Sequence, residues 1–386
     1  VSQGAIDTVV ATPQNVSSLL QRTDVAVGAV LVPGGRAPKV ITTDMVAQMR
    51  ERSIIIDVAI DQGGSVETIH ATSHQAPTFL KHGVTHYAVP NMPGIVAHTP
   101  VLTSIALDTL AGRRLFLKCE NLQHVGAFKF RGASNAVALL GSEARTGVCT
   151  HSSGNHAQAL ALAAKQHGIP AYIVMPDNAP QVKVKGVRSH GAEITFCEPT
   201  LSARESTSAA LIERTGATFI HPYDNPLVIA CQGSAALELI AEDGPFEAII
   251  TPVGGGGLLS GTCISTRALL PDSRIFGAEP TGADDAARSL AAGELIPQTN
   301  PNTICDGLLT SLSNLTFGII NDHVERIFTI TDEEVLAAMT LLHNHLDIVV
   351  EPSGATVLAA VLTEEFRVLS DIDSVGLIIS GGNIDP

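Results

Sequence analysis

The sequence predicts an α/β fold, and three observations carry this prediction. Short apolar runs alternate with segments of helical periodicity along almost the whole chain. The runs are continuously apolar, as in strands buried on both faces, and lack the alternation of a half-exposed strand. Hydrophobic residues make up 45% of the chain and charged residues 16%, with 34 Gly and 21 Pro, a balance that suits packed layers of sheet and helix.

The apolar runs and the segments between them define the elements that we expect. Strands are expected at Asp24–Val32, Ser53–Ile60, Thr146–Thr150, Pro170–Met175, Ala192–Cys197, Ala248–Val253, Arg274–Glu279 and Ser374–Ser380. Helices are expected at Asn155–His167, Ser202–Thr215 and Gly233–Ala241. Strands that alternate with helices favour parallel sheets. Ligands of such sheets bind at the carboxyl ends of the strands, so the turns that follow these strands are the candidate sites.

Charge and cysteine content exclude several classes of protein. The formal net charge is −15, which repels phosphate backbones, so no nucleic-acid partner is expected. None of the six cysteines belongs to a Cys-x-x-Cys pair, and reduced thiols in a cytoplasmic protein are the favoured interpretation. The apolar stretches are too short to span a bilayer and no secretory signal opens the chain, so no membrane association is expected.

Residues 1–94 differ in character from the rest, and we place the boundary near Asn91–Ile95. Three motifs in this first part resemble the later half of the nucleotide-binding domain of alanine dehydrogenase: Gly28–Lys39 (GAVLVPGGRAPK), Ile56–Gly64 (IDVAIDQGG) and His86–Gly94 (HYAVPNMPG). The resemblance implies a partial Rossmann-like segment, with Asp61 and Asn91 near a nicotinamide.

The motif that a dinucleotide site needs is not found in this segment. Such a fold holds the pyrophosphate on a Gly-rich turn at a helix N-terminus. The pair Gly34 and Gly35 is followed by no helix with three suitably spaced glycines. NAD-dependent oxidation of an amino acid is therefore an alternative function only, and a remnant, a fusion product or a structural cap is the favoured interpretation of residues 1–94.

A lysine between two aromatic rings is the first of four patterns in residues 95–386. Lys129 lies between Phe128 and Phe130 in the sequence FKFRG. An apolar setting lowers the pKa of a lysine and leaves a neutral amine that can attack an aldehyde. The same sequence fits an edge strand with alternating faces, so this pattern alone leaves both interpretations open.

Two further patterns predict anion-binding turns between a strand and a helix. The segment His151–Gln158 (HSSGNHAQ) opens an Ala-rich helix, where hydroxyls and backbone amides can hold a carboxylate; a simple helix cap is the alternative. The segment Thr251–Ser260 (TPVGGGGLLS) contains four consecutive glycines, which allow several amides to turn toward one phosphate. For this glycine loop the functional interpretation is favoured over a flexible loop.

The fourth pattern, Ser380–Asn383 (SGGN), follows a strand and would be a plain turn in isolation. At the carboxyl ends of parallel strands, all four patterns would face one crevice. Their order resembles that in the fold-type II pyridoxal-phosphate enzymes, which include serine/threonine dehydratases, serine racemase and hydroxyaspartate dehydratase. The resemblance covers nearly all of residues 95–386 and implies a tryptophan synthase β-like fold. This fold has two lobes with open, mostly parallel sheets, the small lobe at about 147–225.

The resemblance implies a role for each matching residue. Lys129 would carry pyridoxal 5'-phosphate as a Schiff base and take the Cα proton, and Ser153 would act as acid or base on the opposite face. Phe128 would pack on the ring, Asn155 would bond its phenolic oxygen and Ser380 would face its nitrogen. The cofactor-binding set is Phe128, Lys129, Asn155, Gly254, Gly255, Gly256, Gly257, Leu258 and Ser380. The substrate carboxylate would be held by Ser152, Ser153, Asn155 and His156.

A hydroxyl at position 380 bears on the reaction type. It cannot hold the pyridine nitrogen protonated as an aspartate would, so the loss of a β-hydroxyl is favoured after the Cα proton leaves. We therefore expect an ammonia-lyase that removes water and ammonia from L-threonine, L-serine or 3-hydroxyaspartate and gives a 2-oxo acid. An amino-acid racemase on the same scaffold is the alternative, because Ser153 is present. The family also implies a homodimer.

The segment Gly277–Asp285 (GAEPTGADD) resembles the cation site of this family. The carboxylates of Glu279 and Asp285 and the carbonyl of Ala283 are hard oxygen ligands that suit Mg²⁺ or Ca²⁺, and a solvated acidic turn is the alternative. Two other positions stand apart. Cys231 occupies a place where the family leads us to expect glycine, and Glu351 resembles a residue of the pocket wall without an assigned role.

Overall fold

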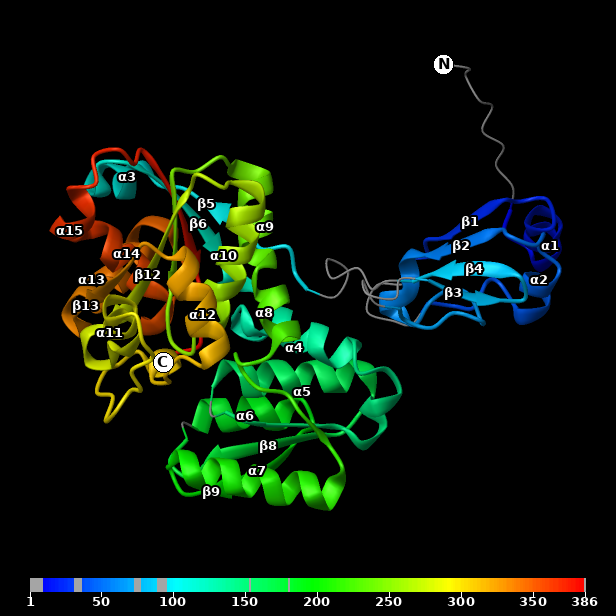
Figure 1. Cartoon of the computed structure of the whole chain (residues 1–386), viewed down its shortest axis with the longest axis horizontal. Coiled ribbons are helices and arrows are strands. Elements are labelled where there is room, and N and C mark those ends of the chain that lie inside the picture. Colours follow the sequence, from blue (N-terminus) through cyan, green and yellow to red (C-terminus); the bar gives the residue numbers. More distant parts are fainter. Residues whose placement is uncertain are drawn as a thin grey trace. The chain divides into compact units, whose positions relative to one another are not determined.

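The computed structural model describes residues 10–30, 37–72, 78–88, 96–152, 154–179 and 181–384, with the side chains of 61–62, 142–144 and 201 left out. The chain divides into two compact units, residues 1–95 and 96–386. Figure 1 shows the elements of each unit under the labels used below.

The first unit is a four-stranded sheet with two short helices. The strand order is β1 (Val25–Gly28), β2 (Ile54–Asp57), β4 (Val84–Tyr87) and β3 (Thr78–Lys81). One face buries Ile55 and Val84 together with Val46, which belongs to α2 (Thr43–Ala47); the other helix is α1 (Pro13–Leu20). Strands β1, β2 and β4 are parallel, whereas β3 pairs antiparallel to β4, because His82 and Gly83 at φ of +53° and +74° reverse the chain in a tight turn.

The second unit has a large lobe built on a six-stranded sheet. The order is β13 (Arg326–Ile330), β12 (Arg274–Pro280), β11 (Ala248–Pro252), β14 (Ser374–Ile379), β6 (Arg114–Cys119) and β5 (Val101–Leu102). All neighbours are parallel except β5 and β6. Helix α14 (Pro352–Leu362) packs on one face of the sheet, and α9 (Ser234–Asp243) and α10 (Gly257–Leu269) pack on the other (Figure 1).

In the described part of the second unit, seven further helices lie outside the small lobe's sheet layers. They are α3 (Ile105–Ala111), α4 (Lys129–Ala138), α8 (Pro226–Gln232), α11 (Asp285–Ala292), α12 (Asn314–His323), α13 (Asp332–Leu346) and α15 (Glu364–Arg367). The largest core cluster lies between the sheet and α14, with Phe276, Phe328 and Phe366 in mutual contact at 5.3–5.5 Å between ring centroids. Every residue of β11 and β14 is buried, as expected for central parallel strands.

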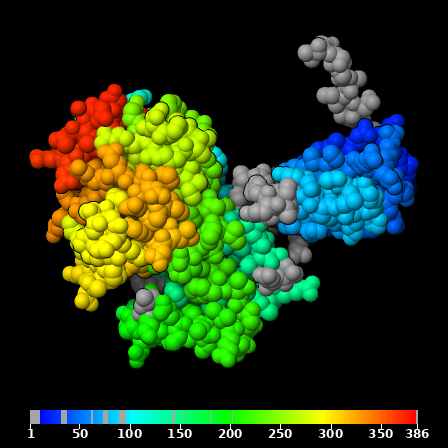
Figure 2. All heavy atoms as spheres, viewed as in Figure 1, coloured from blue at the N-terminus to red at the C-terminus, as the bar shows by residue number. Residues whose placement is uncertain are grey.

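The small lobe is a four-stranded parallel sheet between helices. Its order is β10 (Thr218–Phe219), β7 (Val148–His151), β8 (Ala171–Pro176) and β9 (Glu193–Cys197). Helices α5 (Asn155–His167) and α6 (Gln181–Ser189) lie on one side and α7 (Leu201–Thr215) on the other (Figure 1). In Figure 2 the green atoms of this lobe project from the yellow, orange and red atoms of the large lobe.

The structure confirms the predicted α/β fold and corrects some of the predicted bounds. Helix α5 has the bounds expected from the sequence, and it ends because Gly168 takes a left-handed conformation with φ of +66°. The strand expected at Ser53–Ile60 ends at Asp57, whose carboxylate caps the 3-10 helix η1 (Val58–Gln62) by accepting from the N–H of Ala59. Within the described part of the chain, no helix is long and apolar enough to cross a membrane.

Candidate active site

Lys129 opens a helix at the junction of the two lobes. The edge-strand interpretation of its flanking sequence is wrong, since α4 begins at Lys129 and packs against α5 of the small lobe and α8. The Nζ atom of Lys129 donates to the carbonyl of Pro222 at 2.9 Å and lies 5.0 Å from the ring centroid of Phe128. Burial lowers the pKa of Lys129 to about 8, and the nearby Glu351 carboxylate opposes this shift. A usable fraction of neutral amine is therefore present near pH 8.

The glycine loop lies between β11 and α10 and has no room for side chains. A Cβ atom on Gly255 would collide with the ring of Tyr223, and one on Gly254 would lie 3.0 Å from the carbonyl oxygen of Gly307. Gly256 has φ of +83° and caps α10 without a side-chain hydrogen bond. The N–H groups of the first turn, up to Leu258, are therefore free of a capping side chain and suit a phosphate.

Ser380 follows β14 and is connected directly to the segment that carries the lysine. Its carbonyl accepts a hydrogen bond from the N–H of Phe128 at 3.0 Å, and Gly381 forms a bridge with Ala127. The Ser380 side chain is 3% exposed, and its hydroxyl makes no hydrogen bond to another described residue. A buried hydroxyl of this kind has donor and acceptor capacity left for a ring nitrogen.

Asn155, the first residue of α5, contacts two residues of the large lobe. Its Nδ2 donates to the carboxylate of Glu351 at 2.8 and 3.1 Å, and its Oδ1 accepts from Nδ2 of Asn383 at 2.9 Å. The structure thus brings Asn155 to the same turn as Ser380. Local sequence assigns no role to Glu351, because its partner Asn155 lies 196 positions away in the chain.

The second strand–helix turn presents backbone donors more than side chains. Gly154 caps α5 without a side-chain hydrogen bond, and its N–H donates to the hydroxyl of Ser152 at 3.3 Å. The ring of His156 is buried, its Nε2 contacts the carbonyl of Ile220 at 3.2 Å, and burial lowers its pKa to about 3. The proton therefore lies on Nε2, and His156 offers a carboxylate its main-chain N–H instead of its ring.

Several residues expected at sites lie outside the described part of the chain. Ser153, the expected second acid or base, is one of them. Asn91 and the side chain of Asp61, expected near a nicotinamide, are the others.

In the first unit, the loop after β2 is held by Lys39, whose Nζ donates to the carbonyls of Gly63 and Gly64 at 2.6 and 2.8 Å.

The expected cation ligands are close together and buried. Glu279 is the penultimate residue of β12 and Asp285 opens α11, with exposed fractions of 1% and 2%, and Ala283 between them is fully buried. Burial raises the pKa of Glu279 to about 9 and that of Asp285 to about 6. No group of three or more His, Cys, Asp or Glu side chains able to hold a metal occurs among the described residues. Two carboxylates and a carbonyl still form a hard-oxygen set that fits Mg²⁺ or Ca²⁺ completed by water.

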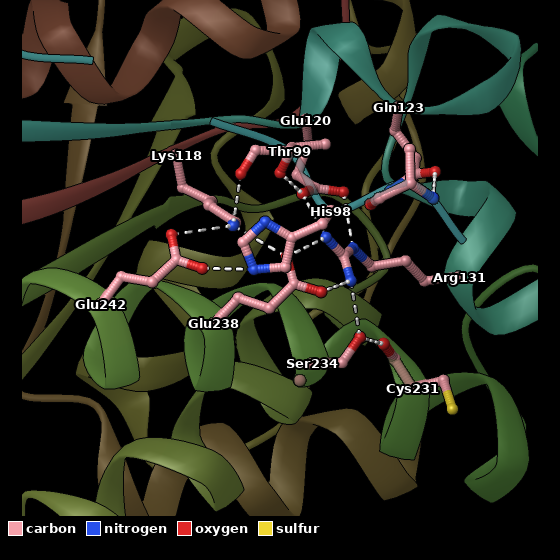
Figure 3. A network of polar contacts seen from close by, with 12 residues as sticks. His98, Thr99, Lys118, Glu120, Gln123, Arg131, Cys231, Ser234, Glu238 and Glu242 are labelled. Carbon is pink, nitrogen blue, oxygen red and sulfur yellow. Dashed lines mark hydrogen bonds and ion pairs between the residues drawn. The ribbon is translucent and has the colours of Figure 1, made fainter. Parts of the chain in front are cut away.

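A buried charge cluster supports the start of α4 (Figure 3). The guanidinium of Arg131 donates to Glu238 at 2.6 Å and to the hydroxyl of Ser234 at 3.0 Å. Lys118, fully buried in β6, lies 2.7 Å from the same Glu238 carboxylate and donates to the carbonyl of Thr99 at 2.7 Å. Full pairing of this kind is what makes charges tolerable inside a protein.

Other groups that no sequence motif singles out lie around the lysine. His221 and Tyr223 meet edge to face at 4.6 Å between ring centroids beside the glycine loop, and burial lowers the pKa of His221 to about 4. Lys183 of α6 forms an ion pair with Asp306, which opens the 3-10 helix η7 (Asp306–Leu308) in the large lobe. The ion pair therefore joins the two lobes.

The geometry agrees with what comparisons with known proteins find. The family described as pyridoxal-phosphate dependent enzyme matches residues 93–381, and the alanine dehydrogenase/PNT C-terminal domain matches residues 1–110. Serine racemase of Dictyostelium discoideum is 51% identical over 290 residues, which cover 74% of this chain and 90% of that protein. The β-hydroxyaspartate dehydratase of Paracoccus denitrificans (strain Pd 1222) is 47% identical over 75% of this chain and 92% of its own. The crystal structure of the Dictyostelium racemase superposes with a TM-score of 0.73 at 50% identity, covering 75% of this chain and 94% of that one.

The chain belongs to the pyridoxal-phosphate-dependent enzymes of fold type II, in the branch of serine racemases and hydroxy amino acid dehydratases. A partial alanine dehydrogenase-like segment precedes this enzyme domain in the sequence. The residues of this site fit the cofactor, since they combine a buried amine, a helix start without a capping side chain behind a glycine loop, and a buried hydroxyl that bonds no other described residue. We expected elimination before racemisation, and the comparisons favour the racemase alternative instead.

Proposed function

We propose that this chain is a serine racemase that also removes water and ammonia from serine or 3-hydroxyaspartate. The observation that carries the proposal is the position of Lys129, a buried amine with a lowered pKa, between the glycine loop and the turn at Ser380. Identity of 51% with a serine racemase and 47% with a β-hydroxyaspartate dehydratase supports these two reactions on one scaffold.

Each part of the pocket has a proposed task. The N–H groups of Gly254–Leu258 hold the cofactor phosphate, Phe128 packs on the ring and Ser380 faces its nitrogen. Backbone N–H groups at the start of α5, together with Ser152 and Ser153, hold the substrate carboxylate. The bound pyridoxal phosphate supplies an electron sink that weakens the Cα–H bond of the amino acid joined to it.

Racemisation needs a proton donor and a proton acceptor on opposite faces of Cα. The neutral amine of Lys129 takes the Cα proton on one face, and the hydroxyl of Ser153 delivers a proton on the other. Lys129 then carries one extra proton and Ser153 lacks one; exchange with solvent restores both groups, so no atom is gained or lost overall. Reversal of the two tasks converts the opposite enantiomer.

Elimination needs only the Lys129 face. After Lys129 takes the Cα proton, the electron pair forms a Cα–Cβ double bond, the Cβ–O bond breaks, and the hydroxide leaves as water with the proton that Lys129 returns. The released enamine becomes an imine, and its hydrolysis gives ammonia and a 2-oxo acid. Because Ser380 carries no charge opposite the ring nitrogen, we expect this reaction to compete with racemisation.

A product analysis with one variant tests the proposal. Purified protein with added pyridoxal phosphate and L-serine should give D-serine, seen by chiral chromatography, together with pyruvate. Ser153→Ala should lose D-serine formation while it keeps pyruvate formation from L-serine. Pyruvate without any D-serine from the unaltered protein would leave elimination as the function, and neither product would reject the assignment. The expected homodimer is tested separately by light scattering.

A further inference from the structure

A polar cluster bridges the two lobes beside Lys129. Asn155 comes from the start of α5 in the small lobe, whereas Glu351 precedes α14 and Asn383 follows β14 in the large lobe. Glu351 is 2% exposed, so its carboxylate depends on protein donors for solvation. A Cβ atom on Gly381 would lie 2.5 Å from Oε1 of Glu351 and 3.2 Å from Nδ2 of Asn155, so the cluster lies directly against the turn at Ser380.

The hydrogen bonds of the cluster determine which way the Asn155 amide points. An ionised carboxylate only accepts and an amide nitrogen only donates, so Nδ2 of Asn155 must face Glu351, at 2.8 and 3.1 Å. The Oδ1 atom then accepts from Nδ2 of Asn383, which is itself held by the carbonyl of Val125 at 2.7 Å. The main-chain N–H of Asn383 also donates to Glu351, at 3.2 Å.

Charged groups face Glu351 from three other elements. They are Lys129 of α4, Lys183 of α6 and Asp306 of η7. Burial raises the pKa of Glu351 to about 7, the Asn155 hydrogen bond opposes this rise, Asp306 adds to it and Lys183 opposes it. The carboxylate thus changes its ionisation near neutral pH, and with it the strength of its hold on Asn155.

We infer that Glu351 is a positioning residue, whose ionised carboxylate orients the Asn155 amide so that one N–H is directed at the phenolic oxygen of bound pyridoxal phosphate. A neutral side chain at this position accepts from Nδ2 of Asn155 less strongly, and the hydrogen bond from Asn383 is then the main contact that orients the amide, so the N–H directed at the cofactor is held less firmly. The inference rests on the proposed cofactor pocket but not on the choice between racemisation and elimination.

A double-mutant cycle tests whether Glu351 acts through Asn155. The dissociation constant of pyridoxal phosphate is measured by absorbance titration of the apoprotein at pH 8 for the unaltered chain, Glu351→Gln, Asn155→Ala and the double variant. We expect Glu351→Gln to weaken binding about tenfold, the size of one charge-assisted hydrogen bond. In the Asn155→Ala background the same substitution should change binding less than about twofold, because its target is gone. Equal losses in both backgrounds would overturn the inference.

A second measurement uses only the unaltered chain and a cofactor analogue that cannot form a Schiff base with Lys129. Pyridoxine 5'-phosphate keeps the phenolic oxygen and phosphate but has no aldehyde, and its binding to the unaltered chain is followed by calorimetry from pH 6 to pH 8. Affinity should rise as Glu351 ionises near pH 7; affinity that is flat or falls over this range contradicts the inference.

A matched control removes a carboxylate at the other end of the same strand. Glu247 accepts from the N–H and the hydroxyl of Ser374, which begins β14, the strand that leads to Ser380. Glu247→Gln should leave the affinity for pyridoxal phosphate and its pH dependence unchanged, and an effect as large as that of Glu351→Gln would also overturn the inference. If borohydride traps no cofactor on Lys129 of the unaltered chain, the pocket assignment fails instead.

Discussion

Arg131 and Glu120 meet in two parallel hydrogen bonds of 2.7 Å, Nε to Oε2 and Nη2 to Oε1, with both side chains completely buried. The same guanidinium bonds a second carboxylate, that of Glu238 in α9. One cation therefore joins α4, α9 and the segment after β6. Because Lys129 lies two residues before Arg131 in the first turn of α4, this pairing fixes the position of the reactive amine.

Removal of the Arg131 guanidinium should lower the free energy of unfolding strongly. In Arg131→Met, the Glu120 carboxylate stays buried and the Glu238 carboxylate is 16% exposed, with Lys118 as the remaining cation. We expect a loss of about 3–5 kcal/mol in the free energy of unfolding, measured by urea denaturation. The exposed pair of Arg214 and Glu193, at 3.1 Å, provides the control: Arg214→Met should cost about 0–1 kcal/mol. Similar losses of unfolding free energy in both variants would mean that the buried ion pairs of Arg131 stabilise the fold no more than an exposed ion pair does.

Lys129→Ala should abolish both proposed reactions while the fold persists. The substitution removes the amine that forms the Schiff base and takes the Cα proton, and we expect turnover to fall at least about a thousandfold. The variant should also lose the visible absorption band that borohydride traps in the unaltered protein, with an unchanged far-ultraviolet circular dichroism spectrum. Full activity in this variant would reject the assignment of Lys129.

Gly255→Ala should damage the phosphate cradle. The added methyl group collides with the ring of Tyr223, so either the ring or the loop must move, and we expect the affinity for pyridoxal phosphate to fall about tenfold or more. Gly318→Ala in α12 is the control, since its Cβ meets nothing within 4 Å and should stabilise the helix by up to about 1 kcal/mol. An unchanged affinity in Gly255→Ala would show that the loop does not hold the phosphate.

Glu351 should make the stability of the apoprotein depend on pH. The folded-state pKa of about 7 lies above the ordinary value of 4.5, so the folded protein binds this proton more tightly than the unfolded chain. The stabilisation of the folded protein by this tighter proton binding is complete below pH 4.5. It is lost as pH rises through 7, which lowers the free energy of unfolding by up to about 3 kcal/mol. Glu351→Gln lacks this loss, so its melting temperature relative to the unaltered protein should increase from pH 5 to pH 8. A difference that stays constant with pH would contradict this assignment.

A chelator should reveal whether Glu279 and Asp285 bind a cation. Both carboxyl groups are buried, and burial raises the pKa of both; Mg²⁺ or Ca²⁺ would favour their ionised forms and stabilise the folded state. We expect EDTA to lower the melting temperature and excess Mg²⁺ or Ca²⁺ to restore it. Asp285→Asn should remove this response to the ions; a response that persists would place the cation elsewhere.

Local patterns predicted the turns of the site but not the contacts between them. The helix start at Asn155 and the glycine loop were readable because each follows directly from a buried strand and its next residues. Lys129 was ambiguous between strand and helix, since four residues with alternating aromatic side chains do not decide the period. The structure assigns it to α4.

The sequence could not reveal groups whose function depends on distant partners. Glu351 contacts Asn155, which lies 196 residues away in the sequence, and Lys183 contacts Asp306, which lies 123 residues away. Strand β6 was also missed, because Arg114 and Lys118 interrupt its apolar run; the structure buries Lys118 by pairing it with Glu238. Such pairing is decided by tertiary structure and leaves no periodic signal in the sequence.

The strand order of the large lobe has a consequence for how the protein is made. Strand β14 lies between β6 and β11, although it is the last of the three to leave the ribosome. Until it emerges, the pair β5–β6 and the group β11–β12–β13 share no hydrogen bonds, whereas all four strands of the small lobe can already assemble. The nascent chain therefore exposes two unjoined apolar halves that chaperones can recognise. Insertion of Ser374–Ile379 joins the two halves of the sheet and brings Ser380 to Phe128, so this part of the site cannot form before that strand is in place.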